Sequence, residues 1–283
     1  MIHGRALHFV FKVADRTLTA KFYREILGMQ ILRHEEFSEG CEAACNGPYA
    51  NRWSKTMVGY GPEDTHFVVE LTYNYGITHY ETGNDFIGLT IQSSESLKRA
   101  AANNWPVKEH NGLKYVEAPG GYKFFIVDKP QPVDKDPVLK VALACTNLQK
   151  SIAYWNDLLT LKIFEKSPKS VLLGFDDNQT KLELVEIGEP LNRAKAYGRI
   201  AFSCPFDEQP IIDQKVQAVK GTILTPLISL DTPGKATVRV IILADPDGHE
   251  ICFVDDESFR QLSQVDPASD ADLDKYIKSD KSR

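Results

Sequence analysis

The sequence is short of cysteine and has no long apolar run, and each shortage excludes a class of protein. Its 283 residues include 5 cysteines, none of them in a CxxC pair. This usage predicts no disulfide framework and favours a reducing compartment. No apolar segment approaches the ~20 residues of a membrane-spanning helix. We therefore expect a protein of the cytosol, with the mitochondrion left open, and no membrane partner.

Positive charge is not in excess either. The chain has 33 Lys and Arg residues against 39 Asp and Glu residues, for a net charge of −6. That sign disfavours nucleic acid and anionic membranes as partners. The hydrophobic fraction of 42% is ordinary for a soluble globular protein, so we expect a packed core.

Internal similarity organises the chain. The segment DRTLTAKFYREILGMQIL (15–32) matches NLQKSIAYWNDLLTLKIF (147–164), and PGGYKFFIVD (119–128) matches PDGHEICFVD (246–255). A recurrence of this kind predicts two homologous halves. The proline-rich, charged segment DKPQPVDKDP (128–137) has the composition of an exposed linker.

These matches predict three regions: an N-terminal domain over 1–130, a C-terminal domain over 136–258 and a charged tail over 259–283. Within each half, a strand and a helix followed by further strands occur twice. We therefore predict an α+β fold of four βαβββ modules, forming two cupped mixed sheets with the helices outside.

One strand carries an unexpected charge. In THFVVELTYNYG (65–76), the alternate residues Phe67, Val69, Leu71 and Tyr73 form an apolar face, and Glu70 lies on the other face. A buried, unpaired carboxylate is very costly, so Glu70 should face a cation, a metal or an open cleft. The first strand alternates in the same way, with Leu7, Phe9, Phe11 and Val13 apolar and with His8 and Lys12 on the opposite face.

The segments ALHFVFKVADRTLTAKFYREILGMQILR and ELTYNYGITHYETGNDF resemble glyoxalase I and the wider vicinal oxygen chelate superfamily. The resemblance implies two fused domains of that fold. It also implies isomerisation of the hemithioacetal of methylglyoxal and glutathione to S-lactoylglutathione. In that reaction a metal-bound carboxylate moves the proton. The implied cofactors are a divalent metal, zinc or nickel, and glutathione as co-substrate.

In this family the first and last strands of two paired modules each supply one metal ligand. By resemblance, the ligand positions of the first module are His8 and Glu70, both of suitable type. The corresponding residues of the other modules are Phe86 and Phe125, Lys140 and Glu183, and Arg199 and Cys252. If the first module pairs with the fourth, one cup contains His8, Glu70, Arg199 and Cys252.

Two arrangements of that cup are consistent with the residues. In one, Arg199 points away and His8, Glu70 and Cys252 form a three-ligand metal site. In the other, Arg199 replaces the metal as the partner of Glu70, and Lys140 does the same for Glu183. Cys252 occupies the position of the family's catalytic base.

Resemblance also assigns positions that bind glutathione and suggests a lid. Lys12 would contact a glutathione carboxylate, Asn74 its backbone, and Arg199 is a further candidate for substrate binding. The loop SEGCEAACNGPYANRW (38–53) is either a lid over the cup, with Trp53 as its anchor, or surface decoration.

Two functions therefore stand side by side. The first is a glyoxalase I-like enzyme for methylglyoxal or related oxoaldehydes. The second is a catalytically degenerate member that binds a small anionic metabolite or a protein partner. Because the fused halves supply the module pairing internally, we expect a monomer.

Overall fold

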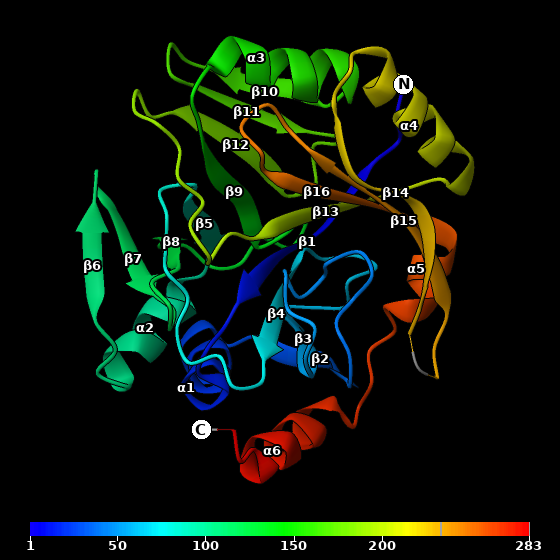
Figure 1. The fold of residues 1–283 in the computed structure, drawn as a ribbon. Helices are drawn as coiled ribbons and strands as arrows, with labels where there is room; N and C mark the ends of the chain where they lie inside the picture. Colours follow the sequence, from blue (N-terminus) through cyan, green and yellow to red (C-terminus); the bar gives the residue numbers. More distant parts are fainter. Residues whose placement is uncertain (233, 283) are drawn as a thin grey trace.

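The computed structural model describes residues 1–232 and 234–282, whose strands form two eight-stranded sheets with the helices at the periphery (Figure 1). Sheet A has the order β14 (Thr222–Asp231), β15 (Thr237–Ala244), β16 (Glu250–Asp255), β13 (Arg199–Cys204), β1 (Arg5–Lys12), β4 (Val68–Asn74), β3 (Trp53–Gly59) and β2 (Gln30–Phe37). Sheet B has the order β10 (Lys162–Lys166), β11 (Ser170–Gly174), β12 (Lys181–Glu186), β9 (Val138–Cys145), β5 (Phe86–Gln92), β8 (Lys123–Val127), β7 (Leu113–Glu117) and β6 (Val107–His110). Parallel and antiparallel pairs occur in both sheets, so the predicted α+β class with two mixed sheets is confirmed.

The two sheets combine modules from opposite ends of the chain. β1 pairs antiparallel with β13, which joins the first module to the fourth. β5 pairs antiparallel with β9, which joins the second module to the third. Each sheet therefore takes half of its strands from each half of the sequence. This is the pairing that gathers the four ligand positions of the first and fourth modules in one cup.

The repeated helices share an irregularity. In the first module, α1 (Arg16–Lys21) continues as the π-helix η1 (Phe22–Leu27), and in the third module α3 (Leu148–Ile152) continues as the π-helix η2 (Ala153–Leu158). Both begin with a side-chain cap, because Asp15 accepts from the Leu18 amide and Asn147 from the Lys150 amide. The first ends at Gly28 in a left-handed conformation, φ 72°, which glycine adopts without strain.

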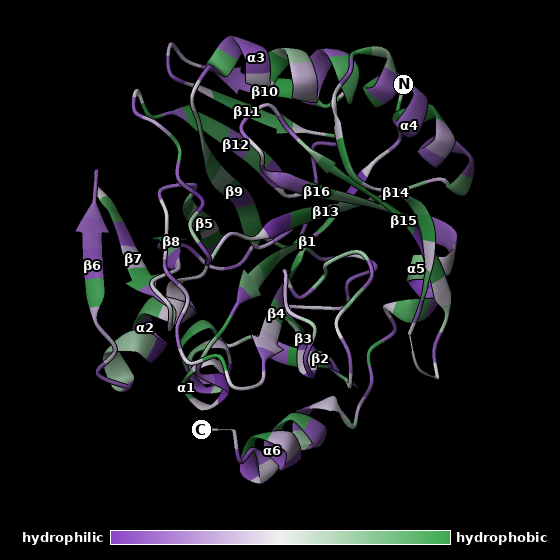
Figure 2. Cartoon of the chain, viewed as in Figure 1, coloured by the Kyte–Doolittle hydropathy of each residue, from purple (hydrophilic) through white to green (hydrophobic). Residues whose placement is uncertain are grey.

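The remaining helices lie at the periphery of the sheets. They are α2 (Ser94–Ala102), the 3₁₀ turn η3 (Phe206–Glu208), α4 (Gln209–Ala218), α5 (Asp256–Leu262) and α6 (Ser269–Ser279). Figure 2 shows hydrophilic and hydrophobic residues interleaved along α4 and α6, as expected for helices that bury one face. Within the described ranges, no helix is long and apolar enough to cross a membrane.

The main core joins both sheets, and β1 shows how one residue departs from the expected alternation. Phe9, Phe11 and Val13 lie in the main apolar cluster, as predicted. Leu7 does not: it packs in a second cluster with Ala43 and residues of β15 and β16. The pairing of β1 with β13 shifts register between Ala6 and His8, and this bulge changes the face on which Leu7 lies.

The C-terminal segment docks on the first module through charge. Asp280, just after α6, accepts from Arg16 Nη2 at 3.0 Å and from the Tyr73 hydroxyl at 2.7 Å. Leu273 of α6 is buried, and Arg24 pairs with Asp270 and Asp274 at 2.6 and 2.8 Å. The charged tail expected from composition therefore forms a packed helix over residues distant in sequence.

We expect Asp280→Asn to lower the free energy of unfolding by about 1.5–3 kcal/mol, because it weakens two hydrogen bonds to a charged group that is largely shielded from water. Chemical denaturation measures the loss. Lys281→Gln at the adjacent exposed position is the control and should change stability little. Equal losses in both variants would contradict the docking role of Asp280.

Candidate functional site

A cavity of about 390 Å³ lies against sheet A. Its floor comes from β1, β4, β13 and β16, and its walls come from loop residues 39–45, the β14–β15 hairpin and α5. Apolar lining is supplied by Trp53, Val240, Val254 and Phe259, among others, so the cavity is mainly apolar, with a smaller set of charged side chains.

The four positions predicted to share a cup all line this cavity: His8, Glu70, Arg199 and Cys252. The adjacent strand pairings bring them together, since β13 lies between β1 and β16, and β1 lies between β13 and β4. The convergence of these positions in space is therefore as predicted from the sequence. Their individual surroundings differ from the expectation in several respects.

His8 and Glu70 form the polar centre of the cavity. His8 Nε2 lies 3.4 Å from Glu70 Oε2, and the Thr72 hydroxyl donates to Glu70 Oε1 at 3.3 Å. On the other side of the ring, His8 Nδ1 is 2.6 Å from Glu63 Oε1. Because a carboxylate accepts, Nδ1 is the donor there, which fixes the orientation of the ring and aims Nε2 at Glu70.

Arg199 is not the partner of Glu70, so that alternative is wrong. Its Nη2 donates to Glu250 Oε2 at 2.8 Å and to the carbonyl of Ala44 at 3.2 Å. Glu250 lies directly opposite Arg199 in the β13–β16 register and neutralises it. The companion prediction for sheet B is confirmed, because Lys140 and Glu183 form an ion pair at 2.6 Å.

A chain of buried charges continues from His8 along the wall of the cavity, where Arg33 and Lys55 are lining residues. Arg33 Nη2 donates to Glu63 Oε2 at 3.3 Å, and Arg33 Nη1 donates to Glu35 Oε1 at 2.9 Å. Glu35 also meets Lys55 at 3.3 Å and Lys235 at 3.1 Å. Charge alternates along this path, so each buried group has an opposite neighbour.

The charged neighbours of Glu63 and Glu35 keep both carboxylates ionised. Burial would raise the pKa of Glu63, but His8, Arg33 and Arg5 outweigh it and the pKa is lowered. Burial would likewise raise the pKa of Glu35. Lys55, Arg33 and Lys235 outweigh this effect and hold the pKa at about 2. Glu63 therefore remains a carboxylate that orients His8 near neutral pH.

Sequence reasoning missed Glu63, Arg33 and Glu35. Glu63 follows β3 in a turn-rich segment, PED, that reads as solvated, and no pattern in the sequence marks it. Arg33, Glu35 and Lys55 did carry a signal, because charges within strands β2 and β3 need partners. Glu35 lies directly opposite Lys55 in that pair of strands.

Cys252 is a neutral thiol in this site. Burial raises its pKa to about 12, and the nearby guanidinium of Arg199 only partly offsets the effect. At neutral pH the side chain is therefore protonated and offers no base. Its predicted catalytic role stays a prediction that this environment does not favour.

Lys12 and Asn74, predicted to bind glutathione, lie outside the cavity lining. Lys12 donates to the Tyr197 carbonyl at 2.7 Å and sits 3.4 Å above the Tyr197 ring centroid. Burial lowers its pKa to about 8, with Glu250 opposing and Arg199 adding to the shift. Both side chains serve internal contacts, and their roles toward a ligand stay predictions.

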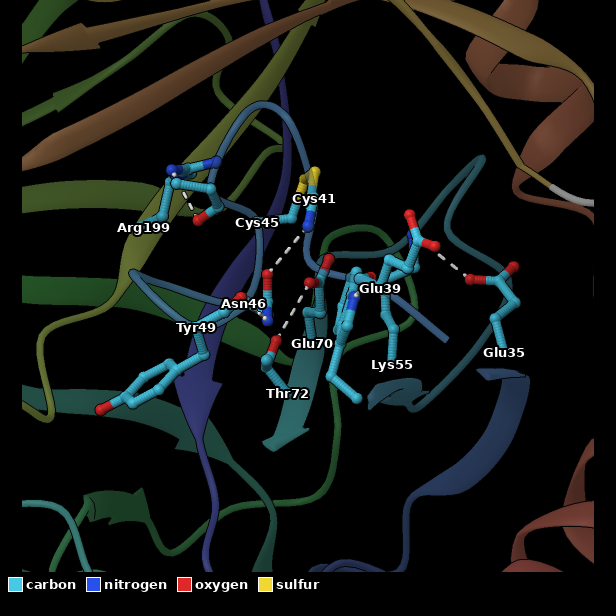
Figure 3. Close-up of a disulfide and its surroundings, with 12 residues drawn as sticks. Glu35, Glu39, Cys41, Cys45, Asn46, Tyr49, Lys55, Glu70, Thr72 and Arg199 are labelled. Carbon is cyan, nitrogen blue, oxygen red and sulfur yellow. Dashed lines mark hydrogen bonds and ion pairs between the residues drawn. A yellow bond between two sulfur atoms is a disulfide. The ribbon is translucent and has the colours of Figure 1, made fainter. Parts of the chain in front are cut away.

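Asn74 instead holds the loop over residues 38–53. Its Nδ2 donates to the Asn46 carbonyl at 3.0 Å, and its Oδ1 accepts from Asn46 Nδ2 at 2.9 Å. Trp53 Nε1 donates to the Glu39 carbonyl at 2.9 Å. Figure 3 shows this loop beside Glu70 and Arg199, which is the position that a lid would have.

The same loop contains a disulfide between Cys41 and Cys45, which corrects the expectation of no disulfide framework (Figure 3). Both residues line the cavity. Spacing alone did not reveal the pair, because a CxxxC sequence in a loop permits bonding only when the turn brings the side chains together.

The donor set does not fit a resident metal centre. Among the described residues, no group of three or more His, Cys, Asp or Glu side chains is arranged to hold a metal ion. His8 and Glu70 supply two donors at the predicted place, whereas a protein metal site commonly has three or four. Arg199 and the protonated Cys252 occupy the other two positions.

Fold and cavity together define a two-domain glyoxalase-type protein of the vicinal oxygen chelate superfamily. Glyoxalase I from Zea mays superposes with a TM-score of 0.75 at 25% identity, covering 92% of this chain and 95% of that one. The models of glyoxalase domain-containing protein 4, N-terminal, and of its C-terminal domain match residues 88–128 and 147–262.

Two relatives align over almost their whole length. Glyoxalase domain-containing protein 4 of Mus musculus is 58% identical, covering 100% of this chain and 95% of the relative. Glyoxalase 1 of Caenorhabditis elegans is 46% identical, covering 99% and 98%. The chain belongs to the glyoxalase domain-containing protein 4 family.

We expect Glu35→Gln to lower the free energy of unfolding by about 3 kcal/mol at pH 7, using ~1.4 kcal/mol per pKa unit. Because the folded-state pKa lies below the usual 4.5, this contribution is present above pH 4.5 and is lost as pH falls toward 2. Denaturation curves at several pH values should show the variant and the parent converging in acid. The exposed Glu25→Gln is the control, and a loss independent of pH would contradict the assignment.

Proposed function

We propose that the cavity on sheet A catalyses a glyoxalase-type isomerisation, with the hemithioacetal of methylglyoxal and glutathione as substrate. The observation that carries the proposal is the pairing of His8 Nε2 with Glu70 Oε2, 3.4 Å apart on the cavity floor. The similarity to a protein named glyoxalase 1 supports it.

In this proposal, proton transfer is divided between two side chains. The Glu70 carboxylate takes the proton from the carbon that bears the hydroxyl group and returns it to the adjacent carbon, giving the thioester. His8 moves the proton between the two substrate oxygens through Nε2. Glu63 acts as a positioning residue, because its bond to Nδ1 fixes the ring.

A divalent metal held by His8 and Glu70, the finer form of the proposal, has less support. His8 and Glu70 supply two donors, and the third position holds Arg199, which is paired with Glu250 and cannot bind a metal. The set of ligands is therefore incomplete. The mechanism is therefore carried by the chain's own side chains and contains no step through a metal.

The incomplete donor set also favours a second candidate. In it, the cavity binds a small anionic metabolite or part of a partner protein without turnover. Arg33, Lys55 and Arg199 line the cavity, although each has a carboxylate partner. The two functions differ in one observable, which is turnover by the pure protein.

We expect the purified chain to form S-lactoylglutathione from methylglyoxal and glutathione, and Glu70→Gln to lower kcat by about 10²–10⁴-fold, the usual contribution of a positioned base. Following thioester absorbance measures the rate. Glu183→Gln is the matched control, since Glu183 holds the corresponding position in sheet B and does not line the cavity.

The control variant should keep the parent rate, and thermal unfolding should show that both variants are folded. No turnover by any form, together with saturable binding of S-lactoylglutathione, would favour the binding candidate. Equal loss of rate in both variants would remove Glu70 from the mechanism.

We expect less than one metal equivalent per chain after the untagged protein is offered zinc, nickel or manganese and then dialysed. The physical reason is that the site supplies only two donor side chains. Elemental analysis measures the content, with His8→Ala as the comparison. One full equivalent that His8→Ala loses would overturn the metal-free mechanism and restore a metal centre on His8.

A further inference from the structure

We propose that Cys41 and Cys45 form a reversible dithiol–disulfide site that controls the loop over the cavity. The two sulfur atoms are bonded, both residues are only partly buried, and both line the cavity. The chemical partner is a small-molecule thiol and its disulfide, such as reduced and oxidised glutathione. Control of the cavity rests on the proposed function, whereas the redox site itself does not.

The loop is anchored at both ends of the bonded segment. Before it, the Gly40 amide donates to the Ala50 carbonyl at 3.0 Å, and Trp53 Nε1 donates to the Glu39 carbonyl. After it, Asn46 is fully buried and makes two hydrogen bonds with Asn74. Its side-chain Nδ2 donates to Asn74 Oδ1, and its carbonyl accepts from Asn74 Nδ2. Only residues 41–45 lie between these anchors.

The intervening segment is a short turn held by local hydrogen bonds: the Ala44 amide donates to the Cys41 carbonyl at 2.8 Å, and the Gly47 amide donates to the Ala44 carbonyl at 2.9 Å. The Cys41 amide donates to Asn46 Oδ1 at 3.1 Å, Ala43 is buried, and the Ala44 carbonyl accepts from Arg199. The disulfide is the single covalent constraint on this stretch. Its breakage frees the part of the loop that borders the cavity, while Asn46 and Trp53 keep the rest in place.

The disulfide is open to exchange and the other cysteines are not. It closes a loop of sequence separation 4, and short loops gain the least entropic stabilisation from a cross-link. Cys145 and Cys204 are buried, and burial raises their thiol pKa values, to about 11 for Cys145. Cys252 has a pKa of about 12. The raised pKa values disfavour thiolate formation at these three cysteines, whereas the partly exposed sulfur atoms of Cys41 and Cys45 are already joined in a bond that an external thiolate can attack.

The exchange is balanced as follows. A thiolate attacks one sulfur of the protein disulfide and releases the other cysteine as a thiolate, which takes a proton. A second thiolate attacks the external sulfur of the mixed disulfide and releases the second cysteine. The protein disulfide gains two electrons, and two small thiols become one disulfide. The reverse reaction with that disulfide closes the pair again.

The test uses the full-length protein in buffers of reduced and oxidised glutathione at several ratios, followed by acid quenching, alkylation and peptide mass mapping. We expect reduction to expose two additional alkylated thiols, at Cys41 and Cys45, and oxidised glutathione to reverse this. Hydrogen exchange of the amides at 41–45 should be several-fold faster in the reduced form, with β11 unchanged as the internal control.

Variants separate the loop from the rest of the fold. Cys41→Ser/Cys45→Ser should show fast loop exchange under all conditions, and Cys252→Ser should keep the redox response. If reduced glutathione does not open the Cys41–Cys45 disulfide in the folded protein, and oxidised glutathione does not close it, the redox site is overturned. Conversion without any change in loop exchange would overturn its control of the loop. Neither readout uses turnover, so failure of the isomerase assay is a distinguishable result.

Discussion

The antiparallel pairing of β1 with β13 is the constraint on which the rest of the structure depends. It joins strands from the two ends of the chain and thereby makes β1 an inner strand of sheet A, between β13 and β4. The cavity floor exists only because of this adjacency. It places His8 of β1, Glu70 of β4 and Arg199 of β13 on one surface, although they come from sequence positions far apart.

Because these charges lie on one surface and are shielded from water, each needs a neighbour of opposite charge, and the chain provides such neighbours as ion pairs. Arg199 is neutralised by Glu250, and Arg33 lies between Glu63 and Glu35. Breaking one member would leave a buried, uncompensated charge, which costs several kcal/mol, so the pattern acts as a unit. As a consequence, Glu70 pairs with His8 and the Thr72 hydroxyl and not with the Arg199 guanidinium.

The sequence shows the strand alternation, the repeated helix and the ligand positions, and these predict the four modules. Which modules pair, and hence which ligand positions converge at the cavity, comes from the structure. The sequence does not predict that Glu250 is the partner of Arg199, because the two residues lie opposite each other only in the β13–β16 register. Glu63 is missed for a related reason: a turn residue has no periodicity that fixes its direction. The Cys41–Cys45 bond depends on a local loop conformation, which composition and compartment arguments do not address.

The two sheets have diverged from one plan in opposite directions. In sheet B, the partly buried Phe86 packs against Phe9 and Phe11 at ring-centroid distances of 5.3 and 5.0 Å, so an aromatic contact with the core stands where the family has a ligand position. Lys140 and Glu183 close on each other there. Sheet A kept a histidine, a carboxylate and a loop that lines an open volume. Because Glu183 is paired with Lys140 while Glu70 lines a cavity, the chemistry is sought at Glu70 and not at Glu183.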